Sequence, residues 1–324
     1  MPSAIRINAP GGPEVMRWEE VAVGDPGPGE ARVRHTAVGV NYIDTYHRSG
    51  LYKLPMPSGL GSEGAGTVEA TGPGVDWVKP GDRVAYCGGP LGSYSEARVM
   101  PAERLVKVPD GISDRSAATL MLKGLTTQYL FRQSYKLEAG ETILFHAAAG
   151  GVGLIACQWA RALGVTMIGT VGSDEKAALA KANGCTHTIV YTRENFVDRV
   201  KELTGGKGVP VVYDGIGKDT FPASLDCLSP RGLFVSYGNA SGPVPPFDIL
   251  LLSAKGSLYV QRPTLVSYAT KREDINAMSG ELFDLVRTGA IVSEPRQTFP
   301  LKDAAEAHKA LQSRGTTGAT ILVP

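Results

Sequence analysis

Cysteine is scarce in this chain of 324 residues, and its four cysteines are widely spaced. No two of them lie closer than 28 residues, so the chain contains no C-x-x-C metal-binding knuckle. Scattered single thiols are typical of a reducing compartment, where cysteines remain unpaired. We therefore expect four reduced cysteines and no zinc site built from cysteine pairs.

Net charge is also nearly absent, since Lys and Arg total 33 against 32 for Asp and Glu. This balance gives no electrostatic footprint for nucleic acid or for an anionic membrane. No apolar run approaches the roughly 20 residues that span a bilayer, and residues 1–8 lack the apolar core of a signal peptide. These features predict a cytoplasmic protein that binds neither membrane nor nucleic acid.

Proline is absent from the middle of the chain. Twelve of the 22 prolines fall in residues 1–109, and none falls between Pro109 and Pro210. The proline-rich part alternates short β-type runs (31–38, 66–71 and 82–87) with Gly/Pro turns, which favours a compact, irregular β-barrel. The change in composition predicts a domain boundary near residues 110–120.

The middle of the chain alternates strand-like and helix-like segments. A helical pattern over residues 113–132 precedes it. Strands are predicted at 143–145, 165–170, 188–191, 209–214, 232–237 and 258–260, and helices at 154–163, 174–183, 193–203 and 221–228. This βαβα order predicts an α/β fold with a parallel sheet covered on both faces. Two further helices (273–287 and 302–313) precede a last strand, 319–323, which we expect to pair back in the first domain.

A glycine turn lies between the first of these strands and its helix. The G-x-G-x-x-G pattern falls on residues 148–153, with Ala148 in place of the first glycine. A strand, a glycine turn and a helix in succession are the context of a dinucleotide-binding fingerprint. The missing Cβ atoms let the backbone approach a pyrophosphate, which the free amides of the helix N-terminus then face. We expect Gly150, Gly151 and Val152 to contact the cofactor there; a tight packing turn is the alternative.

Several motifs occur together in the order typical of one superfamily. They are Gly39-Val-Asn-Tyr-Ile-Asp44, Gly61-Ser-Glu-Gly-Ala-Gly66, Gly81-Asp-Arg-Val84 and Ala147-Ala-Ala-Gly-Gly-Val-Gly153. Over essentially its whole length the chain resembles the medium-chain dehydrogenase/reductase superfamily. Within it, residues 41–52, residues 122–127 and Arg314 resemble zinc-free, zeta-crystallin-like quinone oxidoreductases, especially bacterial NADPH:quinone oxidoreductases.

The resemblance implies an architecture and an assembly. It implies a GroES-like β-barrel catalytic domain, residues 1–122 with 264–324. A Rossmann cofactor-binding domain, residues 123–263, is inserted in it, and the family's ligand site lies in the cleft between the two. Residues 258–260 resemble the family's edge strand, which pairs across a homodimer.

Three positions argue against a catalytic zinc ion. Zinc-bearing relatives carry cysteine, histidine and often cysteine where this chain has Asn41, Ser62 and Lys123. A catalytic zinc ion needs three such ligands and one open position. We therefore expect no metal, and an ion pair or backbone hydrogen bonds for Glu63. Oxidation of an alcohol requires removal of the hydroxyl proton, and without a Lewis acid the pKa of this proton stays high. Reduction of a quinone needs less help, because the quinone is already electrophilic.

The cofactor is expected to be NADPH. An NAD-binding Rossmann unit places Asp or Glu about 20 residues past the glycine turn, and this chain has Val171 there. A loop containing Gly172, Ser173 and Lys176 follows, and the lysine offers a positive charge to a 2′-phosphate. The resemblance adds Tyr191 and Arg314, and arginine suits a phosphate because its fork binds two oxygens. Asp174 and Glu175 argue in the other direction.

The resemblance also implies the residues around the reacting atoms. Asn41 and Tyr46 would border the nicotinamide, Thr127 would lie near its carboxamide, and the loop with Gly238, Asn239 and Ser241 would flank the cofactor. Tyr52 and Lys123 would line the acceptor pocket. A tyrosine or lysine there can donate a hydrogen bond to the quinone oxygen as charge develops. A purely structural role is open for each of these side chains.

Three functions remain open from the sequence. The first is NADPH-dependent reduction of quinones, by hydride or by single-electron transfer. The second is NADPH-dependent reduction of α,β-unsaturated ketones or aldehydes. The third is binding of NADPH or RNA without turnover, against which the balanced charge argues.

Overall fold

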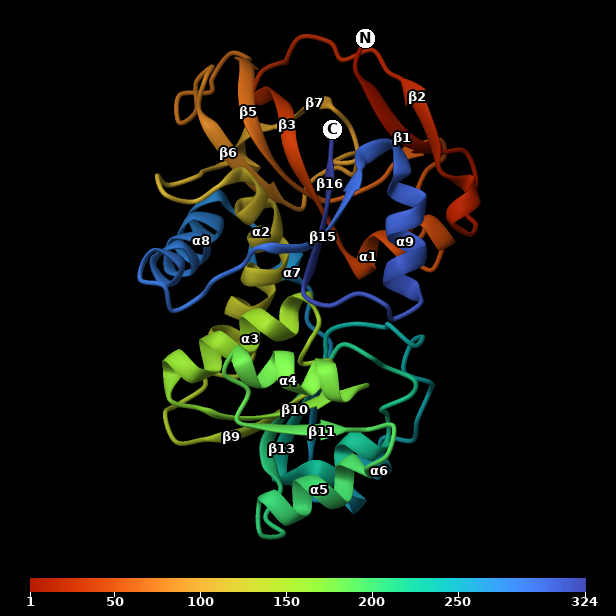
Figure 1. Cartoon of the computed structure of the whole chain (residues 1–324), viewed down its shortest axis with the longest axis vertical. Helices are drawn as coiled ribbons and strands as arrows, with labels where there is room; N and C mark the ends of the chain where they lie inside the picture. Colours follow the sequence, from red (N-terminus) through yellow and green to blue (C-terminus); the bar gives the residue numbers. More distant parts are fainter. The chain divides into compact units, whose positions relative to one another are not determined.

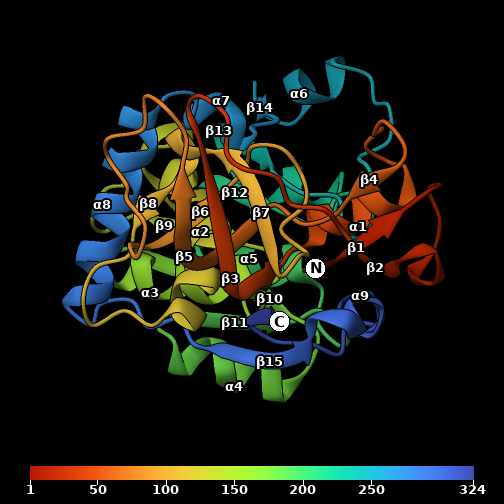
Figure 2. The same cartoon turned by 90° about the horizontal axis from the view of Figure 1, so that it is seen from above.

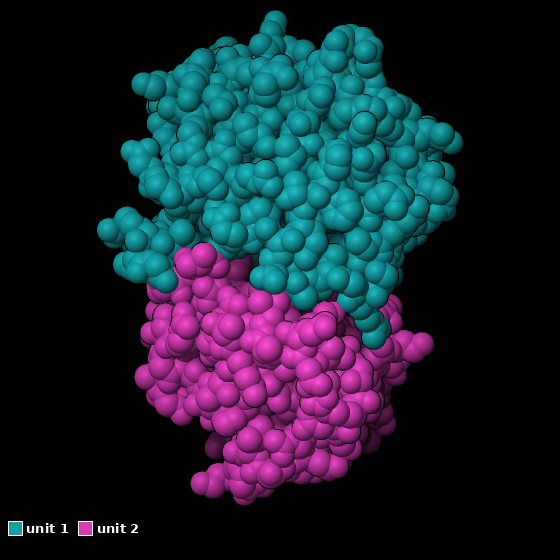
Figure 3. All heavy atoms as spheres, in the orientation of Figure 1, with its two compact units in different colours: residues 1–125, 269–289, 293–324 teal, residues 126–268, 290–292 magenta.

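The computed structural model describes residues 1–324, which form two compact units (Figure 1). Unit 1 comprises residues 1–125, 269–289 and 293–324, and unit 2 comprises residues 126–268 and 290–292 (Figure 3). Unit 2 contains one β-sheet, and unit 1 contains two.

A six-stranded, fully parallel sheet forms the centre of unit 2. In sheet order its strands are β11 (His187–Val190), β10 (Thr166–Val171), β9 (Thr142–Phe145), β12 (Val209–Asp214), β13 (Leu228–Ser236) and β14 (Tyr259–Gln261). Strand β9 comes first in the chain and lies inside the sheet, so the strand order reverses beside it. Open α/β sheets bind their ligands at the carboxyl ends of the strands at such a switch point. The predicted α/β fold is confirmed.

Helices cover both faces of this sheet, as Figure 1 shows. Helices α3 (Gly151–Leu163) and α4 (Asp174–Ala182) lie on one face, and α5 (Phe196–Leu203) and α6 (Leu250–Ala254) lie on the other. The short helix α7 (Leu265–Tyr268) follows β14. Fully buried Leu144, Ile168 and Phe234 pack with Val200 of α5, which makes one apolar core between strands and helix.

One predicted helix of unit 2 is wrong. The segment 221–228 contains only a 3-10 turn, Ala223–Cys227, and strand β13 begins at once with Leu228. Pro222 stands before this turn and has no amide hydrogen to donate. The remaining five residues are too few for an α-helical crossover, so the chain crosses to the next strand through a tighter turn.

Unit 1 contains a seven-stranded sheet and a three-stranded sheet. The larger sheet has β15 (Pro295–Pro300), β16 (Ala319–Val323), β3 (Glu30–Val40), β5 (Glu63–Thr71), β6 (Arg83–Cys87) and β8 (Val106–Lys107) in this order, and β7 (Ala97–Pro101) also pairs with β3 (Figure 2). The smaller sheet has β2 (Arg17–Glu20), β1 (Ser3–Ile7) and β4 (Ser58–Gly59). Strand β16 pairs antiparallel with β3, so the C-terminal strand returns to the first domain as predicted.

Four helices have residues in unit 1. They are α1 (Tyr42–Ser49), α2 (Asp114–Tyr129), α8 (Arg272–Arg287) and α9 (Ala304–Gln312). Helix α2 continues as a π-helical turn, Leu130–Ser134. The interior of the larger sheet is apolar, with Val33, Val68, Val84 and Met100 buried against one another. No helix of the chain combines the length and the apolar composition that a membrane span requires.

Candidate functional site

The glycine turn of unit 2 is packed too closely to accept side chains. Strand β9 ends at Phe145, and helix α3 begins at Gly151 with Gly150 as its N-cap. A Cβ atom on Gly153 would lie 2.3 Å from the carbonyl oxygen of Ala147, which is backbone. The amide of Gly150 donates to the same oxygen over 2.9 Å. The turn therefore places the first amides of a 13-residue helix beside a bare backbone, the arrangement that favours a pyrophosphate.

The alanine in place of the first glycine has a structural explanation. Ala148 is fully buried, and its amide donates to the carbonyl oxygen of Thr170 on β10. Opposite it stands Gly169, where an added Cβ would lie 2.5 Å from the Ala148 methyl carbon. The missing side chain at Gly169 makes room for the Ala148 methyl group, so the turn keeps its close contact with the sheet.

His146, between β9 and the turn, is a buried core histidine. Its Nδ1 lies 2.9 Å from Thr170 Oγ1, and its Nε2 lies 3.0 Å from Ser224 Oγ. Burial lowers the pKa of His146. The ring therefore joins β9, β10 and the turn after β12, and it holds the base of the glycine turn.

The predicted 2′-phosphate residues of unit 2 lie at the ends of β10 and β11. A Cβ atom on Gly172 would lie 3.0 Å from Tyr191 Oη, so the tyrosine hydroxyl faces this glycine. Ser173 is the N-cap of α4, and its hydroxyl oxygen accepts the amide of Lys176 over 3.3 Å. Three of the predicted cofactor residues are therefore brought to one edge of the sheet, next to Tyr191.

Arg193 was missed by the sequence analysis. Its two terminal nitrogens donate to the Asp174 carboxylate over 2.6 and 2.5 Å, and both side chains are largely exposed. The arginine lowers the pKa of Asp174. The carboxylate that argued against NADPH is thus paired with a cation. The sequence feature that could have indicated Arg193 is its position, two residues after Tyr191 of the predicted 2′-phosphate site.

The loop with Gly238, Asn239 and Ser241 packs against the loop that follows β12. A Cβ atom on Gly238 would lie 2.5 Å from the Gly215 carbonyl oxygen. The Ser241 hydroxyl donates to the Ile216 carbonyl over 3.0 Å and accepts the Asp219 amide over 2.9 Å. The Ser241 hydroxyl thus ties together the two loops at the carboxyl ends of β12 and β13.

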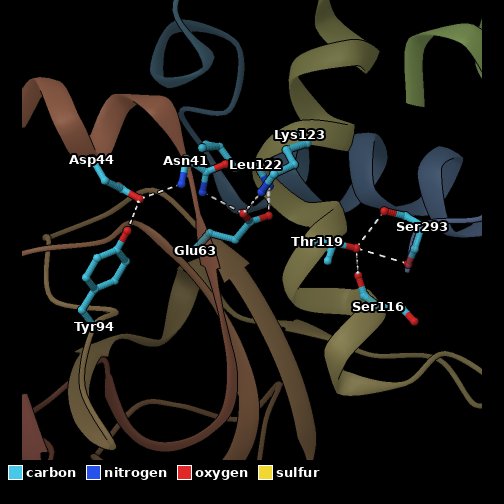
Figure 4. A network of polar contacts seen from close by, with 9 residues as sticks. All are labelled: Asn41, Asp44, Glu63, Tyr94, Ser116, Thr119, Leu122, Lys123 and Ser293. Atoms are coloured by element: carbon cyan, nitrogen blue, oxygen red, sulfur yellow. Dashed lines mark hydrogen bonds and ion pairs between the residues drawn. The ribbon is translucent and has the colours of Figure 1, made fainter. Parts of the chain in front are cut away.

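In unit 1 a buried carboxylate gathers three donors (Figure 4). Glu63 Oε2 accepts Nζ of Lys123 and Nδ2 of Asn41, each over 2.8 Å, and Oε1 accepts the Leu122 amide over 2.6 Å. Glu63 is fully buried, and Lys123 and Asn41 are nearly so. The expectation of an ion pair or backbone hydrogen bonds for Glu63 is confirmed, since it makes the ion pair with Lys123 and one hydrogen bond to the backbone.

These contacts occupy the positions at which zinc-bearing relatives carry ligands. Lys123 and Asn41 are hydrogen-bond donors toward Glu63, and the buried Ser62 hydroxyl has no hydrogen-bond partner in the protein. Across residues 1–324 no group of three His, Cys, Asp or Glu side chains is arranged to hold a metal ion. The Lys123 ammonium repels a divalent cation, and the Asn41 NH2 group that faces Glu63 offers it no lone pair, so this donor set does not suit zinc.

Asn41 is fixed from its other side by Asp44. Asn41 is the N-cap of α1, its backbone amide donates to Asp44 Oδ2 over 2.9 Å, and Tyr94 Oη donates to the same oxygen over 2.9 Å. Burial raises the pKa of Asp44 to about 7. Tyr94 Oη also lies 2.9 Å from Nε2 of His308. Asn41 therefore begins α1 in a fixed orientation.

The predicted tyrosines form a second group in unit 1. The ring of Tyr46 lies 5.3 Å from that of Tyr52 and 5.8 Å from that of Tyr42, measured between centroids. Burial raises the pKa of Tyr42, and the charge of Arg314 acts in the opposite direction, which places Arg314 near this group. Thr127 is fully buried in α2.

Comparison with known proteins gives full-length matches. The profile described as zinc-binding dehydrogenase matches residues 151–282, and that described as alcohol dehydrogenase GroES-like domain matches residues 27–110. The quinone oxidoreductase of Pseudomonas aeruginosa is 60% identical over 100% of both chains. The 2-haloacrylate reductase of a Burkholderia species is 49% identical over 100% of this chain and 99% of its own. The crystal structure of Escherichia coli quinone oxidoreductase complexed with NADPH has a TM-score of 0.98 at 50% identity, covering 99% of this chain and 100% of that one.

Proposed function

The chain belongs to the quinone oxidoreductase family of the medium-chain dehydrogenase/reductase superfamily, and on that premise we propose that it reduces quinones with NADPH and without a metal ion. The observation that carries the proposal is 60% identity to a quinone oxidoreductase over the full length of both chains. The Lys123–Glu63 ion pair supports the metal-free chemistry, because it fills the place of a zinc ligand with a cation.

We propose that residues 123–263 bind the cofactor and that residues 1–122 with 264–324 form the catalytic domain. The division of the fold into two units supports this assignment. The bare backbone at Gly150 and Gly153 fits a pyrophosphate, and Lys176 and Tyr191 fit a 2′-phosphate. The remaining proposed cofactor residues are Asn41, Tyr46, Thr127, Gly151, Val152, Gly172, Ser173, Gly238, Asn239, Ser241 and Arg314.

NADPH, when bound, supplies the hydride or the electrons that reduce the quinone. The protein orients the acceptor and stabilises the charge that develops on the oxygen of this acceptor. We assign this role to Lys123, Asn41, Tyr46 and Tyr52. Hydrogen-bond donors suffice because the quinone is electrophilic and the product is a stabilised aromatic alkoxide. Water supplies the proton that completes the quinol.

Reduction of activated alkenes is the second candidate. The 2-haloacrylate reductase shares 49% identity over essentially the whole of both chains. A haloacrylate and a quinone both contain a carbon–carbon double bond conjugated to a carbonyl group, so both accept a hydride at carbon or oxygen with similar help from donors.

We also propose that the chain acts as a homodimer in the cytoplasm. Strand β14 is the last strand of its sheet, and Tyr259 on it is 62% exposed. Ile249, Leu250 and Val266 nearby in the sequence are exposed as well. A bare strand edge with exposed apolar side chains is a template for pairing with a second copy. Four free, buried cysteines suit a reducing compartment.

Steady-state kinetics on a panel of acceptors tests the proposed function. The panel contains 1,4-benzoquinone, 1,2-naphthoquinone, an alkenal and 2-chloroacrylate, each measured with NADPH and with NADH in the presence of a chelator. We expect the highest kcat/KM for a quinone with NADPH. A higher value for the alkenal or the chloroacrylate would favour the second candidate, and loss of activity with the chelator would contradict the metal-free chemistry.

A further inference from the structure

Glu63 is the one residue of the buried network in Figure 4 that contacts both proposed quinone-facing donors. It is the first residue of β5, whereas Asn41 follows β3 and Lys123 lies in α2. Three separate segments therefore converge on one carboxylate. A fully buried charge is costly unless it is paired and hydrogen-bonded, and Glu63 meets this condition with the three donors already described.

The neighbouring backbone leaves room for this carboxylate. A Cβ atom on Gly39 would lie 2.2 Å from Glu63 Oε2 and 2.5 Å from the carbonyl oxygen of Ala118. Strand β3 thus has no side chain at the point where the carboxylate lies against it. The absence of a side chain at Gly39, two residues before Asn41, allows Glu63 to reach α2.

The ion pair limits both the position and the charge of Lys123. A lysine side chain has four rotatable methylene groups, and its ammonium is a compact point charge. The contact with Glu63 holds this ammonium in one place and supplies its counter-charge inside the protein. A fixed cation aimed at developing negative charge requires no reorganisation when the reaction occurs.

We propose that Glu63 is a positioning residue for the reduction: it acts through Lys123, whose ammonium it holds in place for the quinone oxygen, while the Asn41 amide helps to fix the same carboxylate. This inference rests on the proposed quinone reduction. The reaction balances without any change at Glu63, since NADPH gives a hydride to the quinone, water gives a proton, and NADP⁺ and the quinol leave.

The test is a double-mutant cycle in the full-length protein with NADPH and 1,4-benzoquinone. E63Q removes the counter-charge and keeps the shape, and K123M removes the cation. We expect kcat of E63Q to fall by about tenfold or more, while the KM for NADPH stays near its wild-type value. We expect the double variant E63Q/K123M to be no slower than K123M alone, because a residue that acts through Lys123 has no effect once the lysine is gone.

A matched control lies in the same helix. Thr119 is fully buried, donates to the Ser116 carbonyl and bonds to Ser293, and it does not contact Glu63 (Figure 4). T119V therefore removes buried hydrogen bonds of α2, and it should lower the melting temperature and leave kcat close to that of the wild type. If E63Q does not fold, E63D keeps the charge but retracts it by one methylene, and the same fall in kcat at constant KM is expected.

The outcomes separate the two proposals. If no quinone supports oxidation of NADPH by the wild-type protein, the proposed function itself is refuted. If the wild type is active and E63Q retains the full kcat, only the role of Glu63 is overturned. If E63Q is unfolded, a full kcat in E63D has the same meaning. Multiplicative losses in the double variant, or an equal loss of kcat in T119V, would also overturn it.

Discussion

Replacing Gly153 by alanine adds one methyl group at the most crowded point of the glycine turn. The new carbon would lie 2.3 Å from the Ala147 carbonyl oxygen and 2.6 Å from the Ala148 carbonyl carbon and oxygen. Ordinary contact begins at 3.4 Å, so the turn and the helix must separate by 3.4 − 2.3, or about 1.1 Å. A Cβ atom cannot rotate away, and Ala147 already has a positive φ of 57°. The backbone of the turn therefore has to move.

This displacement has two measurable consequences. The hydrogen bond from the Gly150 amide to the Ala147 carbonyl is strained, and overpacking of this kind costs about 1–3 kcal/mol of stability. The amides at the start of α3 also shift by about the same distance, and a 1 Å misplacement can cost on the order of 100-fold in function. We expect the Kd for NADPH, measured by calorimetry, to rise by at least about tenfold, or roughly 1.4 kcal/mol, and the melting temperature to fall.

Gly280 offers the matched control for this substitution. It is exposed in α8, and nothing lies within 4 Å of a Cβ atom built on it. The same methyl group there should leave NADPH binding unchanged and raise the stability slightly, since alanine favours a helix over glycine by roughly 0.5–1 kcal/mol. If G153A bound NADPH as tightly as G280A, the turn would not be the pyrophosphate site.

Three further predictions follow from other parts of the structure. K176A and R193A should each raise the KM for NADPH and leave the KM for NADH nearly unchanged. Lys176 offers its charge to the 2′-phosphate, which NADH lacks, and Arg193 neutralises the Asp174 carboxylate that would repel this phosphate. Equal effects on both cofactors would contradict the assignment. Y259K should convert a dimer into monomers in size-exclusion chromatography with light scattering, whereas a wild type that is already monomeric would rule out the proposed dimer. Burial and the Arg48 charge lower the pKa of His308 from 6.5 to about 3, so the unfolded chain binds a proton that the folded protein does not. Between about pH 6.5 and 3 the wild type should therefore lose up to about 1.4 kcal/mol per pH unit through this group as the pH falls, and H308Q should show a shallower acid dependence in urea unfolding.

The alternation of strands and helices and the C-terminal strand were predictable from the sequence, because hydrophobic period and glycine turns are local signals. The 3-10 turn that replaces the predicted helix at residues 221–228 was not predictable. The sheet sets the distance between β12 and β13 that the chain must cross, and this distance is not a local signal. Pattern reading likewise ended α2 at residue 132, whereas the π-helical turn runs to Ser134.

At the candidate site, individual residues were easier to predict than their partners. The sequence identified Asn41 and Lys123 as candidate site residues, and it predicted an ion pair or backbone hydrogen bonds for Glu63. It could not show that both donors bind the same carboxylate, since residues 41, 63 and 123 meet only through tertiary packing. The pairing of Asp174 with Arg193 was hidden for the same reason, although both lie within 20 residues in the chain.

Quinone-dependent oxidation of NADPH by the purified protein tests the central claim most directly. The initial rate is followed by the absorbance of NADPH with 1,4-benzoquinone or 1,2-naphthoquinone, with a chelator present, and is repeated with NADH. We predict turnover that the chelator does not change and a kcat/KM at least about tenfold higher with NADPH, equivalent to roughly 1.4 kcal/mol of transition-state binding. No quinone-dependent turnover, or a preference for NADH, would contradict this account.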